Sequence, residues 1–253
     1  MRGRDFVVFD IETVVDAALA RHEDLVDEKT GEAKFPATPL HQVVAIAIAK
    51  FRREADGTMT FLKARAGGTA AADERALLQG FWSAMAANEP TFIGFNSRGF
   101  DVPVLLHRSM RHGLDAGFFM TSGDKWNSYR QRYAIDWHCD LLDVLSDYGA
   151  ARRMPLDLAA RLVGAPGKLD TDGGDVAQLF GEGRIEEIRA YCVTDVLSTS
   201  LVWLSWLRLE GRLSAEQLAA TRAQMLAWLD ANAAAQPHLA RFAEAWRAAG
   251  GAT

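Results

Sequence analysis

Residues 6–13 read FVVFDIET, an apolar run that passes directly into two acids. Phe6 to Phe9 predict a buried strand, because short runs of aromatic and β-branched residues are typical of sheet interiors. Asp10 and Glu12 follow at the end of that strand. Side chains two residues apart point to the same face of a strand, so both carboxylates should point the same way. The two carboxylates repel each other unless a cation lies between them, so the pair predicts a site for a hard divalent ion. Two solvated acids at the end of a strand would also fit the pattern.

Two further motifs occur later in the chain. Asn96 and Asp101 follow an apolar strand at 91–95 and open a helix, at the strand end where α/β sheets form sites. A helix cap is the alternative for this aspartate. Tyr191 and Asp195 are four residues apart, so they lie one turn apart on one helix face, which could also be ordinary surface. Together, in this order and on these elements, the motifs predict a single site.

The remaining pattern predicts the order βββαβα followed by further helices, which is a mixed sheet flanked by helices. Strands are predicted at 6–9, 42–51, 59–65 and 91–95, and the first three should form a meander. Thr69 is a candidate cap for the first helix, and Ser214 with Gln217 predicts a capping box. A long charged connection over 14–41 could be a lid or an irregular loop. Helices are predicted at 70–87, 101–113, 141–148, 156–163, 184–210, 215–231 and from 237 onward.

Composition narrows the class of protein. The chain has 253 residues, 49% of them hydrophobic and 24% charged, which is an ordinary balance for a soluble globular protein. Its formal net charge of −5 argues against a polycationic nucleic-acid binder but allows a local groove with bound cations. Cys139 and Cys192 are interpreted as small buried residues in a reducing compartment. The longest purely apolar run, 43–49, is too short for a membrane span, and the N-terminus does not resemble a signal peptide, so we expect a cytoplasmic protein without a membrane partner.

The three motifs resemble those of the DEDD superfamily of exonucleases. Phe9 to Thr13, Asn96-x4-Asp101 and Tyr191-x3-Asp195 match in order, and the tyrosine is typical of the DEDDy branch. The sister branch carries a histidine five residues before the last aspartate, where this chain has Ala190. Within this superfamily, the chain resembles bacterial predicted 3′–5′ exonucleases related to the proofreading domain of family B DNA polymerases. The resemblance covers roughly residues 5–205 and implies an RNase H-like fold with a five-stranded mixed sheet and helices on both sides.

The resemblance also implies the chemistry of the site. It implies two divalent cations, Mg²⁺ or Mn²⁺, which would promote phosphodiester hydrolysis by clamping the attacking and leaving oxygens. By position, Asp10 would contact both ions, Glu12 and Asp195 would hold the ion that activates water, and Asp101 would hold the other. Tyr191 would orient the attacking water, because a phenol with a pKa of about 10 is a poor general base. We expect a catalytic domain over residues 1–212 and a helical C-terminal extension over 213–253.

Substrate contacts follow from the same resemblance. Thr13, Asn96 and Phe100 match positions that contact the 3′-terminal nucleotides, although core packing is the alternative for Phe100. Lys168, in a glycine-rich loop, could hold a phosphate or simply be solvated. Residues 98–132 interleave basic and aromatic side chains, which suits a single-strand track or a mixed solvated surface.

The expected function is therefore that of a metal-dependent 3′–5′ exonuclease acting on single-stranded DNA or frayed 3′ ends. Two alternatives stay open at this point. The same metal core would serve a 3′–5′ exoribonuclease, and the same fold could be a non-catalytic nucleic-acid-binding module. Modules of the latter kind normally lose one or more carboxylates, whereas all four acids and the tyrosine are present here. The expected partner is single-stranded nucleic acid, DNA in preference to RNA.

Overall fold

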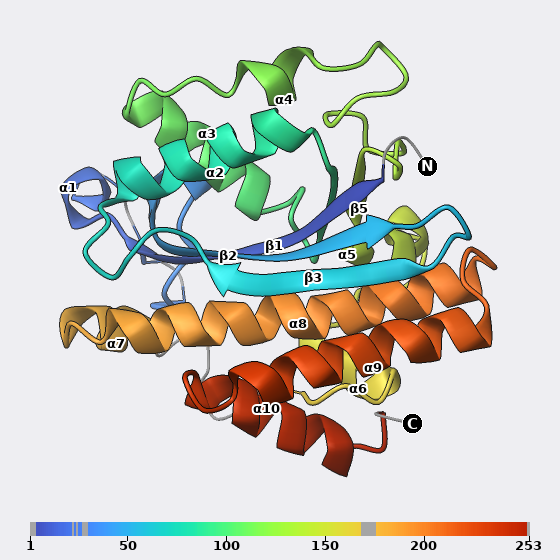
Figure 1. Ribbon diagram of the computed structural model, residues 1–253. Coiled ribbons are helices and arrows are strands. Elements are labelled where there is room, and N and C mark those ends of the chain that lie inside the picture. Colours follow the sequence, from blue (N-terminus) through green and yellow to red (C-terminus); the bar gives the residue numbers. More distant parts are fainter. Residues whose placement is uncertain (1–3, 22, 24, 27–29, 168–175, 252–253) are drawn as a thin grey trace.

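The computed structural model describes residues 4–21, 23, 25–26, 30–167 and 176–251 (Figure 1). Within these residues, the strands are β1 (Asp5–Val15), β2 (His41–Arg53), β3 (Met59–Ala66), β4 (Thr91–Gly94) and β5 (His138–Asp140). They form one sheet in the order β3-β2-β1-β4-β5. The first three strands are antiparallel, whereas β4 is parallel to both β1 and β5. The expected meander and five-stranded mixed sheet are therefore confirmed.

β1 is longer than the sequence pattern predicts. It does not end at the acids but continues to Val15, so Asp10 and Glu12 lie inside the strand. The reason is tertiary, because β2 pairs with β1 along its whole length, with one register shift between Glu12 and Thr13. On the other side, β4 pairs only with residues 6–8 of β1. Beyond that point, β1 offers an edge that β4 does not cover, and the acids lie along it.

Helices cover both faces of the sheet (Figure 1). Phe9 and Ile11 of β1 pack with the layer of α2 (Glu74–Asn88) and α3 (Asp101–Arg111). Val8 packs with the opposite layer, which contains α8 (Ile185–Leu209). The alternation along β1 therefore turns Asp10 toward the side of α8. The shorter helices are α1 (Ala17–Ala20), η1 (Thr38–Leu40), α4 (Gly117–Thr121), α5 (Leu141–Leu145), η2 (Asp147–Gly149), α6 (Leu156–Leu162) and α7 (Val176–Gly181).

The first long helix begins later than expected. Its cap is Asp73, which accepts a hydrogen bond from the backbone N–H of Ala76 at 2.7 Å, and not Thr69. Thr69 belongs to the preceding turn, where its carbonyl accepts from the N–H of Ala72. Both residue types cap helices well, so the choice between them depends on where the chain leaves β3.

The C-terminal helices α9 (Ala215–Asn232) and α10 (Pro237–Ala248) pack beside α8, and α9 also lies against β3. Ser214 and Gln217 form the predicted capping box. The Thr221 hydroxyl donates to the carbonyl of Met59, which joins α9 to the sheet. Met225, like other apolar residues of these helices, belongs to the same core as α8. The domain division at residue 212 stays a prediction.

α8 accounts for much of the apolar character of the chain. By length and composition alone, it could cross a membrane, but its most apolar 18-residue window is 72% buried inside the fold. It contacts both β1 and β2. Packing against the sheet therefore explains why this helix is so apolar.

Candidate active site

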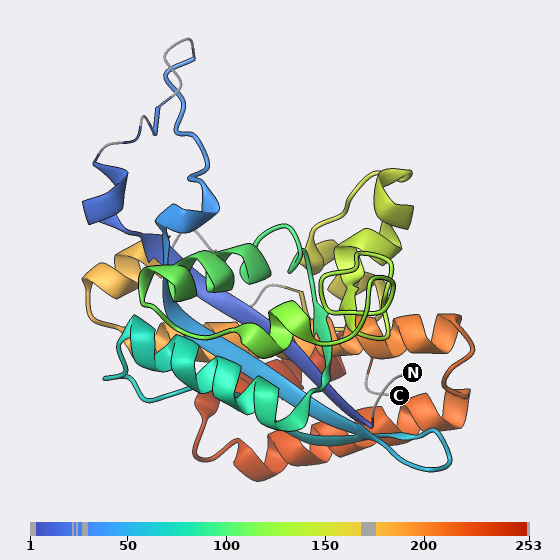
Figure 2. The ribbon, with the colours of Figure 1, turned by 90° about the horizontal axis from the view of Figure 1, so that it is seen from above.

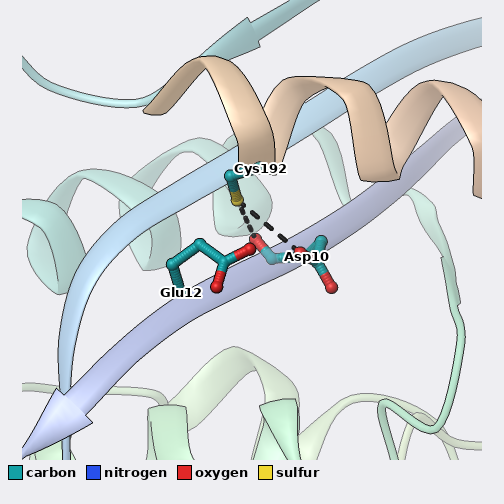
Figure 3. Close-up of side chains that lie close together, drawn as sticks. All are labelled: Asp10, Glu12 and Cys192. Carbon is teal, nitrogen blue, oxygen red and sulfur yellow. Dashed lines mark hydrogen bonds between the residues drawn. The ribbon is translucent and has the colours of Figure 1, made fainter. Parts of the chain in front are cut away.

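Two acids of β1 and one thiol of α8 form a compact cluster (Figure 3). One oxygen each of Asp10 and Glu12 and the sulfur of Cys192 lie within 4.8 Å of one another. Asp10 is partly buried and Glu12 is 9% exposed. The carboxylates extend toward the same side of β1, as the spacing of two residues predicts. This cluster is the base of the candidate site.

Two more acids reach the cluster from other elements. The pKa of Asp10 is raised well above its usual value, first by burial and then by the negative charges of Asp101, Glu12 and Asp195. Asp101 is the first residue of α3, and Asp195 lies near the middle of α8, one turn after Tyr191. The structure therefore gathers four carboxylates from three elements that are distant in sequence.

Asp101 is tied to the uncovered edge of β1. It is 4% exposed, and its carboxylate accepts a hydrogen bond from the backbone N–H of Ile11. Burial raises the pKa of Asp101 to about 7, and the charge of Asp140 adds to that increase. The N-cap position of α3 is Phe100, so the interpretation of Asp101 as a mere helix cap is wrong. Its carboxylate contacts β1 because β4 ends before this part of the strand.

Tyr191 lies beside the acids and is 8% exposed. Its pKa is raised, first by burial and then by the charges of Asp195, Glu12 and Asp10. The phenol also donates a hydrogen bond to Asp195, which favours its neutral form. The one-turn spacing correctly places this pair on one helix face. A phenol held protonated in this way can orient a water molecule but cannot remove its proton at neutral pH.

Cys192 was interpreted from sequence as a small buried residue, and it is fully buried. The structure adds a polar contact, because its thiol donates to the backbone carbonyl of Asp10 at 3.4 Å and to Asp10 Oδ2 at 3.7 Å. Its position directly after Tyr191 is a sequence signal for proximity to the site. The interpretation of Cys192 as a small buried residue does not use that signal.

Asp140 fixes the loop that leads into α3. Its two carboxylate oxygens accept from the backbone N–H groups of Asn96 and Arg98, each at 2.8 Å. Asn96 has a φ of 59°, a left-handed conformation that asparagine tolerates better than most residues. The Arg98 guanidinium donates to the carbonyls of Tyr129, Gln131 and His138. No local sequence pattern indicates this support, which holds the turn before Asp101.

We expect Asp140→Ala to lower the free energy of unfolding by about 2 kcal/mol, because the partly buried backbone N–H groups of Asn96 and Arg98 lose their acceptor. Chemical denaturation measures this loss. The control is Asp230→Ala, which removes an ion pair with Arg247 in which both side chains are about half exposed, and this change should cost about 1 kcal/mol at most. Equal losses in the two variants would contradict the role of Asp140.

The residues predicted to bind substrate have different surroundings. Thr13 shares a hydrogen bond with His41 at 3.0 Å between Oγ1 and Nδ1. Asn96 is partly buried in the loop that Asp140 holds. Phe100 is partly buried and contacts the rings of His41 and Phe35. Lys168 lies outside the described residues. The nucleotide contacts of these residues stay a prediction.

The proposed single-strand track over residues 98–132 is wrong as a continuous surface. Arg108 is 2% exposed because it pairs with Asp16 and Glu74. The Arg98 guanidinium donates hydrogen bonds to backbone carbonyls, and Tyr129 is fully buried. The interleaved aromatic residues therefore mostly fill the core, and these guanidinium groups satisfy polar atoms inside the protein.

Comparison with known proteins places this arrangement in a family. The family described as predicted 3′–5′ exonucleases related to the exonuclease domain of PolB matches residues 33–246, a region that includes Asp101 and Asp195 and follows Asp10 and Glu12. No curated protein matches the chain. The structure is similar to a family B DNA polymerase from the hyperthermophilic archaeon Pyrobaculum calidifontis, with a TM-score of 0.56 and 18% identity over 92% of this chain. This chain spans 29% of that polymerase, and the likeness shows a shared fold, the RNase H-like fold expected from the sequence.

Structures of exonuclease I also align with the chain. A product-bound structure has a TM-score of 0.37 and 13% identity, over 82% of this chain and 44% of its own. The E. coli enzyme in complex with a dA16 oligonucleotide has a TM-score of 0.33 and 15% identity, over 88% of this chain and 45% of its own. The family match covers well over half of the sequence. The chain therefore belongs to the family of predicted 3′–5′ exonucleases related to the exonuclease domain of PolB.

Proposed function

We propose that this protein removes nucleotides from the 3′ end of single-stranded DNA, or of frayed 3′ ends, by two-metal phosphodiester hydrolysis of the DEDDy type. The observation that carries the proposal is the convergence of Asp10 with Glu12, Asp101 and Asp195, whose charges add to burial in raising the pKa of Asp10. Three separate elements supply these acids. A fold gains nothing in stability from such mutual repulsion, so the arrangement is explained by cations that offset it.

The donor set fits Mg²⁺ or Mn²⁺. Carboxylate oxygens are the ligands that these hard ions prefer, and four of them suffice to hold two ions with water in the remaining positions. When bound, the ions would supply an activated water and would stabilise the charge on the leaving oxygen. By its position in the motif, Asp10 would contact both ions. Glu12 and Asp195 are assigned to one ion and Asp101 to the other.

The protein's own groups then position the reactants. The Tyr191 hydroxyl donates to Asp195, so its oxygen can accept a hydrogen bond from the attacking water and orient it. Cys192 donates to Asp10 and so helps to fix the direction of that carboxylate. The loop held by Asp140 sets the start of α3 and with it the place of Asp101.

We expect Tyr191→Phe to lower the rate of hydrolysis by about 10²-fold, because the water loses its orientation while the carboxylates stay in place. The rate of shortening of 5′-labelled single-stranded DNA in Mn²⁺ measures the loss. Calorimetric titration with Mn²⁺ should give unchanged affinity. The control is Tyr133→Phe, at a tyrosine that is 70% exposed, which should leave the rate unchanged. A large loss of Mn²⁺ affinity in Tyr191→Phe would contradict an orienting role.

Labelled oligonucleotides decide the reaction class. Single-stranded DNA and RNA, each labelled at the 3′ or the 5′ end, are incubated with Mn²⁺ or with a chelator. Stepwise loss from the 3′ end of DNA, in metal only, supports the proposal. Faster shortening of RNA would indicate an exoribonuclease on the same metal core. Binding without cleavage of either polymer would indicate a nucleic-acid-binding module and would overturn the catalytic assignment.

A further inference from the structure

Three aromatic rings form a patch beside the candidate site. Phe35, His41 and Phe100 contact one another, with ring centroids 5.0 Å apart for Phe35 and His41, 5.7 Å for Phe35 and Phe100, and 4.8 Å for His41 and Phe100. Phe35 is 77% exposed, whereas His41 is buried and Phe100 is partly buried. We call these three residues the aromatic patch. The ring of Phe35 is open to solvent, and the rings of His41 and Phe100 lie against it.

The patch is attached to the strand that carries the acids. His41 Nε2 lies 3.1 Å from the carbonyl of Pro36, which can only accept, so this nitrogen carries the hydrogen. Nδ1 then accepts from the hydroxyl of Thr13, the residue directly after Glu12. Burial lowers the pKa of His41, in agreement with a neutral ring. The patch is therefore uncharged, and its place relative to the acids is fixed.

Further bonds hold the segment that carries the patch. The described part of the chain between β1 and β2 extends away from the sheet (Figure 2). Its base is anchored to α3, because Arg108 donates to the carbonyl of Pro39 at 3.0 Å and pairs with Asp16 at 2.9 Å. The Thr38 hydroxyl and His107 Nδ1 form a second bond to α3, at 2.9 Å. The exposed ring of Phe35 is thus supported from below by side chains with defined positions.

We propose that Phe35, supported by His41 and Phe100, is a stacking platform for an unpaired base at the 3′ end of the substrate. This inference rests on the proposed function and names residues that would select single strands. Every base has an aromatic face, so an exposed ring binds unpaired bases of any sequence, whereas bases inside a duplex are already stacked on their neighbours. With a net charge of −5, the chain has no general excess of positive charge to attract a backbone. Stacking supplies contact energy that charge does not.

Binding without turnover tests the platform. The probe is a single-stranded oligo-dT with 2-aminopurine as its 3′-terminal base, titrated with protein in chelator so that no hydrolysis occurs. We expect quenching of the 2-aminopurine fluorescence by the wild-type protein. Phe35→Ala should weaken binding about fivefold or more and reduce the quenching, and Phe35→Trp should restore both. The control is Trp126→Ala, at another exposed aromatic residue, which should bind like wild type.

The outcomes separate this inference from the proposed function. Wild-type affinity and quenching in Phe35→Ala would overturn the platform, even if metal-dependent hydrolysis were observed. A wild-type protein that does not bind or quench the probe would also overturn it. Loss of binding in Phe35→Ala, together with an absence of hydrolysis in Mn²⁺, would support the platform and contradict the catalytic proposal.

Discussion

Asp10→Asn should lower the rate of metal-dependent 3′-terminal hydrolysis by on the order of a thousandfold or more, because the ligand assigned to both ions loses its charge. The same change should raise the melting temperature of the metal-free protein. In the folded protein, burial and three neighbouring acids disfavour the negative charge of Asp10. The unfolded chain does not bear this cost, so removing the charge should stabilise the folded state. The amide keeps an oxygen that can accept from Cys192, so local packing should be preserved.

The rate is measured on 5′-labelled single-stranded DNA in Mn²⁺, and stability is measured by thermal unfolding in chelator. Asp5→Asn is the matched control, because Asp5 lies on the same strand and forms an exposed ion pair with Arg52. That control should leave the rate unchanged and lower stability by about 1 kcal/mol at most. Full activity of Asp10→Asn would contradict the metal assignment. A lower melting temperature without metal would show that the acid stabilises the fold.

The metal-free protein should lose stability as the pH rises from about 4 to about 7. The pKa of Asp101 is raised to about 7 in the folded state, above its value of about 3.9 in an unfolded chain. The folded state binds the proton more tightly, so this contribution is present below the unfolded pKa and is lost as the pH rises through the folded pKa. The three-unit difference sets an upper limit of about 4 kcal/mol. Asp10 acts in the same direction.

Mn²⁺ should reverse this loss, and its stabilising effect should be larger at pH 8 than at pH 5, because deprotonated carboxylates bind the ion. Denaturant titrations from pH 4 to pH 8, with Mn²⁺ or chelator, measure both effects. Asp101→Asn should flatten the pH dependence without metal. Asp16 and Glu74 have lowered pKa values, so they contribute stability at neutral pH that is lost only in more acidic solution. An Asp101→Asn profile that follows the wild type would contradict this prediction.

The acids of the site were predictable because their relations are local. Alternation along a strand places Asp10 with Glu12, and one helical turn places Tyr191 with Asp195. The end of β1 was not predictable in the same way, because β2 continues the pairing through polar residues. β5 has only three residues, too few for a periodic signal, and the fifth strand was expected from family resemblance alone.

Other features depended on contacts between distant residues. Asp140 and Cys192 act on the site through partners more than 40 residues away in the chain, and no local pattern identifies those partners. In the stretch over 98–132, a local pattern is present but its interpretation is wrong. Its composition fits a nucleic-acid surface, but composition does not indicate that Arg108 is buried between two acids.

β4 ends at Gly94, and the part of β1 beyond it is approached from both sides of the sheet. Asp101 arrives on a helix of one layer, whereas Asp195 arrives on a helix of the other. Ions held between them would cross-link the two helical layers across the sheet. Binding of the ions would then set how firmly the two layers are held together. The same carboxylates would serve both catalysis and the stability of the fold.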